Sequence, residues 1–141
     1  MTLSMAGRTE AYVDTAALIA FTDGSDSHHA IFRRLFAKPP PLITTTLVVA
    51  EGHGWFLRRF DSARALQFLA LVESIRPLKV CGVGLAELKA ATLVLRRFAD
   101  QPLTLTDAVG LHLMTSRRVH SCWSTDRHMG LAGVPLVIHQ H

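Results

Sequence analysis

The sequence predicts an α/β domain with a central, mostly parallel sheet of about five short strands flanked by helices. Short apolar segments alternate with segments of helical periodicity along the whole chain, which is the pattern of a parallel sheet. The length of 141 residues suits one domain, and 49% hydrophobic against 18% charged residues excludes a disordered chain. No repeat or long linker divides the sequence. We therefore expect one domain over residues 11–141, after a flexible tail over residues 1–10.

The strands and helices are expected in alternating order. Short strands are expected in the apolar segments 11–13, 41–45, 75–80, 120–125 and 134–139. Helices are expected over 15–21, from Asp26 to about Ala37, over 46–59, from Asp61 onward, over 84–98, and from Thr106 to about Arg118. Residues 126–133 are expected to form a turn or a short helix. Asp26 and Asp61 are expected N-caps, because aspartate accepts hydrogen bonds from free backbone N–H groups.

Composition excludes several protein classes. No apolar run approaches the roughly 18 residues that a membrane span needs, and the first residues lack the apolar core of a signal peptide. We therefore expect no membrane association and no export. The cysteines Cys81 and Cys122 lie far apart and outside any CxxC spacing, so neither a zinc site nor a disulfide framework is expected. A reducing cytoplasm fits this cysteine usage best.

The chain is basic, with a formal net charge of +4. Arginine dominates and occurs in four adjacent pairs: Arg33-Arg34, Arg58-Arg59, Arg96-Arg97 and Arg117-Arg118. The planar guanidinium group suits phosphate oxygens, so a polyanion partner is plausible. The alternative for each pair is a solvated helix end, where positive charge complements the helix dipole.

Four acidic residues fall at element boundaries beside apolar segments. Asp14 and Asp126 follow expected strands, Asp107 lies in the first turn of a helix, and Glu51 interrupts an apolar helical stretch. In open parallel sheets, ligands bind beyond the carboxyl ends of the strands. Each acid also has a structural alternative: Asp14 as a helix cap, Glu51 on an exposed helix side, Asp107 as a helix N-terminal acid and Asp126 as a turn residue.

Taken together, the four acids indicate a metal site. Carboxylates brought within a few Å repel one another, and their pKa values rise. A hard divalent cation such as Mg²⁺ or Mn²⁺ removes that repulsion, because it prefers oxygen ligands. An acidic metal pocket in a basic protein suits a phosphodiester substrate, whose charge the metal neutralises while arginines hold flanking phosphates.

Four segments resemble motifs of the PIN domain nucleases, and within them the VapC-like toxins of toxin–antitoxin pairs. VDTAALIA resembles the first motif (Asp14, Thr15), and TTTLVVAE resembles the second, ending in Glu51. LTLTDA resembles the third (Thr104, Asp107), and STDRHMG resembles the fourth (Asp126). Order, spacing and flanking apolar residues agree over positions 11–138. The chain departs from usual family residues at Ala16, Thr104, Ser124 and Met129, none of which removes an acid.

The resemblance implies a PIN-like fold and a Mg²⁺- or Mn²⁺-dependent endoribonuclease. It assigns Asp14 and Asp107 as direct metal ligands, with Glu51 and Asp126 completing the catalytic site. Thr15 and Thr104 would donate hydrogen bonds that orient carboxylates or water. It also implies an RNA substrate, a homodimer, and a small VapB-like antitoxin that enters the acidic site.

Two further residues and two other functions stay open. Asp100 and His128 lie near the motifs; both are expected to be ordinary surface residues, with a role in the site as the alternative. The main alternative function is a non-catalytic PIN-fold module for RNA binding or assembly, which would need no metal. A nucleotide-binding signalling domain is disfavoured, because GxGxxG and GxxxxGK[ST] are absent.

Overall fold

The computed structural model describes residues 10–140, and these form a four-stranded parallel sheet with strand order β3-β2-β1-β4. The strands are β1 (Ala11–Val13), β2 (Leu42–Thr45), β3 (Leu78–Cys81) and β4 (Ser121–Trp123). Strand β1 pairs in parallel with β2 on one side and β4 on the other. The predicted α/β class with a parallel sheet is therefore confirmed. The predicted N-terminal tail lies outside the described residues, apart from Glu10.

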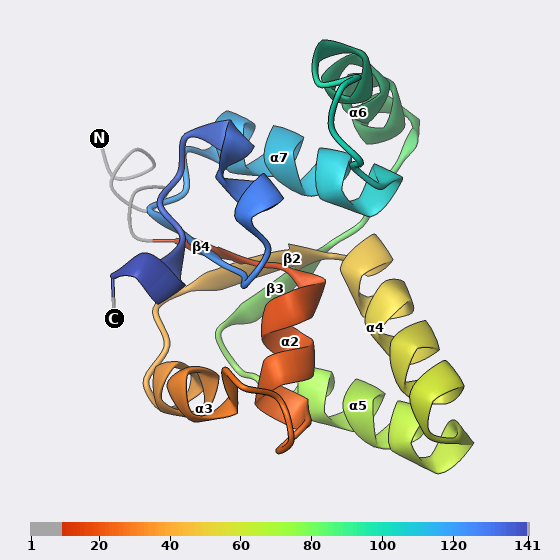
Figure 1. Cartoon of the computed structure of the whole chain (residues 1–141), viewed down its shortest axis with the longest axis vertical. Coiled ribbons are helices and arrows are strands. Elements are labelled where there is room, and N and C mark those ends of the chain that lie inside the picture. Colours follow the sequence, from red (N-terminus) through yellow and green to blue (C-terminus); the bar gives the residue numbers. More distant parts are fainter. Residues whose placement is uncertain (1–9, 141) are drawn as a thin grey trace.

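Six α-helices and two 3₁₀-helices surround the sheet in the described part of the chain (Figure 1). Their bounds are α2 (Thr15–Thr22), α3 (His29–Ala37), α4 (Thr46–Arg59), α5 (Ser62–Ser74), α6 (Leu85–Arg97), α7 (Leu105–Arg117), η1 (Arg127–Ala132) and η2 (Val137–His139). Helix α5 begins after Asp61, whose side chain accepts a hydrogen bond from the N–H of Arg64 as predicted. None of the helices described is long and apolar enough to cross a membrane.

Two details of the prediction were wrong. Residues 134–139 form no fifth strand: Leu136 makes an isolated parallel bridge with Cys122, and η2 begins at the next residue. Pro135 has no N–H to donate to a strand ladder, and the bond from the His139 N–H to the Leu136 carbonyl curls the chain into a helical turn. Asp26 does not cap α3, because its carboxylate accepts from the His28 N–H and the helix begins at His29.

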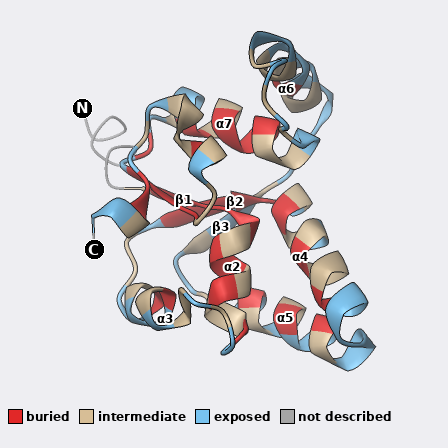
Figure 2. Ribbon diagram, viewed as in Figure 1, coloured by how far each residue is buried: buried red, intermediate tan, exposed pale blue. Residues whose placement is uncertain are grey.

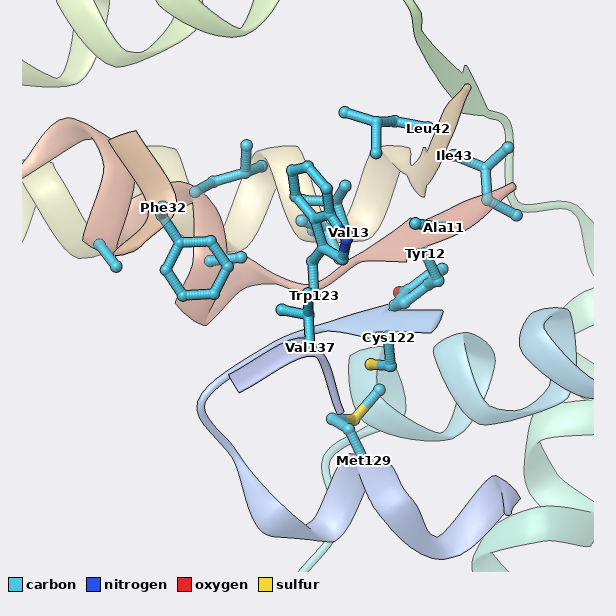
Figure 3. Packing of buried hydrophobic residues seen from close by; sticks show 14 of the residues in the cluster. Ala11, Tyr12, Val13, Phe32, Leu42, Ile43, Cys122, Trp123, Met129 and Val137 are labelled. Atoms are coloured by element: carbon cyan, nitrogen blue, oxygen red, sulfur yellow. The ribbon is translucent and has the colours of Figure 1, made fainter. Parts of the chain in front are cut away.

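Two layers of helices cover the sheet. Figure 1 shows α2, α3 and α5 on one side and α7 on the other, with α6 packed on α7. Figure 2 shows that β1, β2, β4 and the inward sides of these helices are buried, whereas the edge strand β3 and much of α6 are partly or fully exposed. Alternation along the strands sends Val13 and Trp123 to one face and Tyr12 and Cys122 to the other (Figure 3).

Candidate metal centre

Three carboxylates meet at the carboxyl end of the sheet. Asp14 follows β1 directly, Asp126 lies between β4 and η1, and Asp107 lies in the first turn of α7. One carboxylate oxygen from each residue lies within 4.8 Å of the other two. We call Asp14, Asp107 and Asp126 the carboxylate group. The parallel pairing of β1 with β4 brings Asp14 and Asp126 together although the sequence separates them widely.

Asp14 is the buried member of this group, with 4% of its surface exposed. It occupies the N-cap position of α2, but its side chain makes no capping hydrogen bond. Instead, its Oδ2 accepts a hydrogen bond of 2.8 Å from the Ser124 hydroxyl. The Ser124 oxygen in turn accepts a bond of 2.9 Å from the Asp126 N–H. Ser124 therefore links two of the three carboxylate residues.

Burial raises the pKa of Asp14 from 3.8 to about 7. The hydrogen bond from Ser124 opposes this rise, whereas the negative charges of Asp107 and Asp126 add to it. The Asp14 carboxyl group therefore exchanges its proton near neutral pH. A cation bound among the three side chains would favour the ionised form and release that proton.

Asp107 is fixed by a reciprocal capping arrangement at the start of α7. The Asp107 N–H donates to the Thr104 hydroxyl oxygen over 3.1 Å, and the Thr104 N–H donates to Asp107 Oδ2 over 3.0 Å. Such capping boxes hold the side chain and satisfy free N–H groups of the first turn. Thr104 thus orients the carboxylate through its backbone N–H.

Asp126 is held by His128. Its Oδ1 accepts from the His128 N–H over 3.0 Å, and the imidazole Nδ1 lies 2.8 Å from the same oxygen. His128 is therefore in contact with the carboxylate group. Asp100, by contrast, is exposed, and its carboxylate accepts a bond of 3.4 Å from the neighbouring Gln101 side chain.

The two remaining predicted residues, Glu51 and Thr15, are not members of the carboxylate group. Glu51 is half-buried on α4 and is not one of the three clustered carboxylates. Its part in the site stays a prediction. The Thr15 hydroxyl is buried and has no hydrogen-bond partner within residues 10–140, and its predicted role in orienting a carboxylate or water stays a prediction.

The donor set suits a hard divalent cation. Over residues 10–140, no lysine or arginine forms an ion pair with any of the three carboxylates. Gathered negative charge without a lysine or arginine beside it is costly, most of all where one member is buried. Oxygen ligands on rigid strand ends and a helix start match the preference of Mg²⁺ or Mn²⁺. The carboxylate group could therefore bind such an ion.

Two residues at the site were missed as site residues by the sequence analysis. Ser124 was noted only as a departure from the family pattern. It follows β4 directly and comes two residues before Asp126, so its hydroxyl lies at the same edge of the sheet as the two aspartates. Tyr12 lies two residues before Asp14 on β1 and therefore faces the same side of the sheet. Period-two spacing could have identified it.

Comparison with known proteins supports the architecture. No family model and no curated protein matches the sequence. The structure is similar to that of Mycobacterium tuberculosis VapC20, a sarcin-ricin loop cleaving toxin, with a TM-score of 0.80 and 24% identity over 88% of this chain and 95% of that one. The fold is PIN-like. This confirms the architecture that the four sequence motifs predicted.

A second solved structure agrees with this PIN-like fold. It is a toxin–antitoxin complex from Klebsiella pneumoniae, matched with a TM-score of 0.59 and 15% identity over 86% of this chain and 90% of that one. At such low identities the likeness concerns the fold. The activity has to be argued from the side chains of this chain.

Proposed function

We propose that this PIN-like protein is a metal-dependent endoribonuclease that hydrolyses RNA phosphodiester bonds. The observation that carries the proposal is the carboxylate group: three acids from three separate segments, with oxygens within 4.8 Å of one another and no arginine or lysine paired with them in the described chain. Structural ion pairs need a partner of opposite charge. A group of like charges at the ligand-binding edge of a parallel sheet indicates a cation site.

The residues have distinct roles in this proposal. Asp14, Asp107 and Asp126 hold Mg²⁺ or Mn²⁺, and Glu51, from α4, completes the catalytic set on the substrate side. When bound, the ion neutralises charge on the scissile phosphate and supplies hydroxide near neutral pH. Ser124 and Thr104 fix the orientations of Asp14 and Asp107 through the hydrogen bonds described above. Thr15, whose buried hydroxyl has no hydrogen-bond partner among residues 10–140, is proposed to orient a carboxylate or a water molecule.

The charge distribution supports a nucleic-acid substrate. The chain carries 15 lysine and arginine residues against 11 acids, and three of those acids are gathered at the metal centre. Three of the arginine pairs, on α3, α4 and α6, are exposed on both residues. In the fourth pair, Arg117 binds Glu10 at 2.8 Å, so only Arg118 is left for a partner. Exposed guanidinium groups give affinity for phosphates without base selectivity.

The proposal extends to the biological partners. One similar structure is described as a sarcin-ricin loop cleaving toxin and another as a toxin–antitoxin complex. We therefore propose that this protein acts in the cytoplasm as a homodimeric toxin and is inhibited by a small VapB-like antitoxin. Co-expression with the protein encoded beside it, followed by co-purification, tests this part separately from the nuclease activity.

A second function is a non-catalytic PIN-fold module for RNA binding or assembly. The observation that favours it is the position of Glu51 outside the carboxylate group. The two functions differ in their need for metal. A scaffold would bind RNA equally well with Mn²⁺ or with a chelator and would leave the RNA intact.

RNA cleavage tests the main proposal. The full-length protein is incubated with structured and single-stranded RNA and Mg²⁺ or Mn²⁺, beside Asp14→Asn, Asp107→Asn and the matched control Asp100→Asn, an exposed acid with no contact to the group. We expect metal-dependent cleavage that both site variants lose and the control keeps. Cleavage that persists in Asp14→Asn and Asp107→Asn would contradict the assignment.

A further inference from the structure

A buried tyrosine lies beneath the carboxylate group. Tyr12 belongs to β1, and 0% of its surface is exposed. Because side chains alternate along a strand, Tyr12 and Asp14 project from the same face. Figure 3 shows Tyr12 on the same side of the sheet as Cys122 and Met129, opposite Trp123. This is the side covered by α7 and η1.

The Tyr12 hydroxyl reaches the backbone of α7 at Gly110. A Cβ atom at Gly110 would lie 2.6 Å from the Tyr12 hydroxyl oxygen, 2.9 Å from Tyr12 Cζ and 3.1 Å from Met129 Cε. Only glycine leaves room for this contact. Gly110 comes three residues after Asp107, so both lie on one side of α7. Tyr12 therefore connects β1, which leads directly into Asp14, with α7, the helix that carries Asp107.

This contact lowers stability in two ways. The Thr45 side chain lies close enough to the Tyr12 hydroxyl to oppose the rise in pKa that burial causes, but this hydroxyl forms no hydrogen bond of normal geometry among residues 10–140, and an unsatisfied buried hydroxyl destabilises a fold. Glycine in the middle of a helix is also less favourable than alanine. Phenylalanine at position 12 would remove the first cost. Both destabilising features occur at the same contact. This contact joins β1 to α7, and the proposed metal site requires a fixed distance between Asp14, which follows β1, and Asp107 on α7.

We propose that Tyr12 is a positioning residue: its hydroxyl, seated against Gly110, sets the spacing of β1 and α7 and thereby the separation of Asp14 from Asp107. The inference rests on the proposed metal site and adds a residue that holds it in shape. Metal affinity depends steeply on the spacing of the ligands, and residues that orient ligands typically change affinity by about 10–100-fold. Burial, together with the charge of Asp14, raises the pKa of Tyr12, so the hydroxyl keeps its proton.

The chain offers a matched control for this contact. Gly52 is buried within α4, and a Cβ atom there would collide with the ring of Phe68 on α5. At both glycines, the missing side chain lets an aromatic ring pack directly on the backbone of the helix. Only the contact at Gly110 joins two elements next to the carboxylate group, namely β1 and α7. Gly52→Ala measures what the loss of such a contact does to stability alone.

The experiment measures Mn²⁺ affinity by isothermal titration calorimetry and metal-free stability by chemical unfolding, on the full chain. For Tyr12→Phe we expect stability unchanged or raised and Mn²⁺ affinity lowered by about tenfold. For Gly110→Ala we expect lower stability and a loss of affinity of about 10–100-fold, part of which Tyr12→Phe restores in the double variant. For Gly52→Ala we expect lower stability with the affinity of the wild type.

Specific outcomes overturn the inference. Wild-type Mn²⁺ affinity in Tyr12→Phe shows that the hydroxyl does not position the ligands, and that variant decides the matter alone if Gly110→Ala does not fold. Equal loss of affinity in Gly110→Ala and Gly52→Ala shows a general effect of stability and also overturns it. If the wild-type protein binds no Mn²⁺, the proposed metal site fails and the inference falls with it.

Discussion

The two ends of helix α2 carry two buried aspartates in opposite electrostatic situations. Asp14 precedes the helix and Asp23 follows it, with exposed fractions of 4% and 7%. Burial raises the pKa of Asp14 to about 7, and two neighbouring carboxylates add to the effect. Burial acts on Asp23 in the same direction, but hydrogen bonds from Ser25 and the charges of Arg64 and Arg59 outweigh it, and the pKa of Asp23 is lowered.

The difference lies in what surrounds each carboxylate. Asp23 accepts bonds of 2.8 and 3.1 Å from the hydroxyl and N–H of Ser25. The guanidinium groups near it are themselves held on aromatic rings, with Arg64 lying 4.2 Å from the Phe60 ring centroid. That region satisfies its charges with its own residues. Within residues 10–140, Asp14 has one side-chain hydrogen-bond donor in Ser124 and two acidic neighbours, so its end of α2 could bind an external cation.

The largest expected contrast is in stability against pH. A rise in pKa from 3.8 to about 7 means that ionised Asp14 costs the metal-free fold about 4 kcal/mol. This cost is absent below pH 3.8, where the group is protonated in both the folded and the unfolded state, and it reaches its full size above about pH 7. We therefore expect metal-free Asp14→Asn to be more stable than wild type at pH 8, and the gain to disappear near pH 4. Urea unfolding at both pH values measures it.

Asp23→Asn serves as the comparison for this test. Because the pKa of Asp23 is lowered, its contribution is present above pH 3.8 and is lost as pH falls through the lower, folded-state value. Asp23→Asn is therefore expected to be less stable than wild type at pH 8. If the two variants shift stability in the same direction at that pH, the contrast between the ends of α2 is wrong.

The next largest effect is expected at Ser124. Replacing Ser124 with alanine removes the only side-chain donor to Asp14 within residues 10–140 and frees the N–H of Asp126. We expect Mn²⁺ affinity to fall about 10–100-fold in calorimetry. Ser25→Ala, which removes the matching hydroxyl from Asp23, should leave Mn²⁺ affinity unchanged. An equal loss in both variants would point to general destabilisation.

Proton release gives a smaller but specific signal. Near pH 7 the Asp14 carboxyl group is about half protonated, and a cation binds the ionised form. We expect Mn²⁺ binding at pH 7 to release roughly half a proton, and close to none at pH 9. Calorimetry in two buffers of different ionisation enthalpy counts the protons. A release that does not depend on pH would show that Asp14 is not a ligand.

The smallest change in metal affinity is expected at Glu51. Since Glu51 stands outside the carboxylate group, Glu51→Gln should lower Mn²⁺ affinity less than Asp14→Asn, Asp107→Asn or Asp126→Asn. Cleavage should fall more than affinity, because Glu51 is proposed to act on the substrate side. Parallel losses of affinity and cleavage would instead make Glu51 a direct ligand.

Much of the fold followed from local patterns. The alternation of apolar and helical segments predicted all four strands, and Asp61 was correctly predicted as a cap because its signal is contained in a few residues. The fifth strand failed because Pro135 and the turn at Leu136 outweigh the apolar pattern of residues 134–139. The start of α3 was missed because Asp26 uses its carboxylate in the preceding turn.

Less of the site than of the fold could be predicted from the sequence. Asp14 and Asp126 could be placed at one edge from the parallel arrangement alone, and Asp107 came from its helix start. Three features depend on tertiary packing: the hydrogen bonds through Ser124, the contact of Tyr12 with Gly110, and the position of Glu51 outside the carboxylate group. These positions depend on how the helices pack on the sheet, and the spacing of residues in the sequence does not predict that packing.

The order of strands has a consequence for biosynthesis. Strand β1 is made early but pairs with β4, which is made late, and Asp126 follows β4. A nascent chain still attached to the ribosome therefore holds Asp14 and Asp107 without their third companion. The proposed metal centre is therefore assembled only after the last strand has been synthesised and has paired with β1.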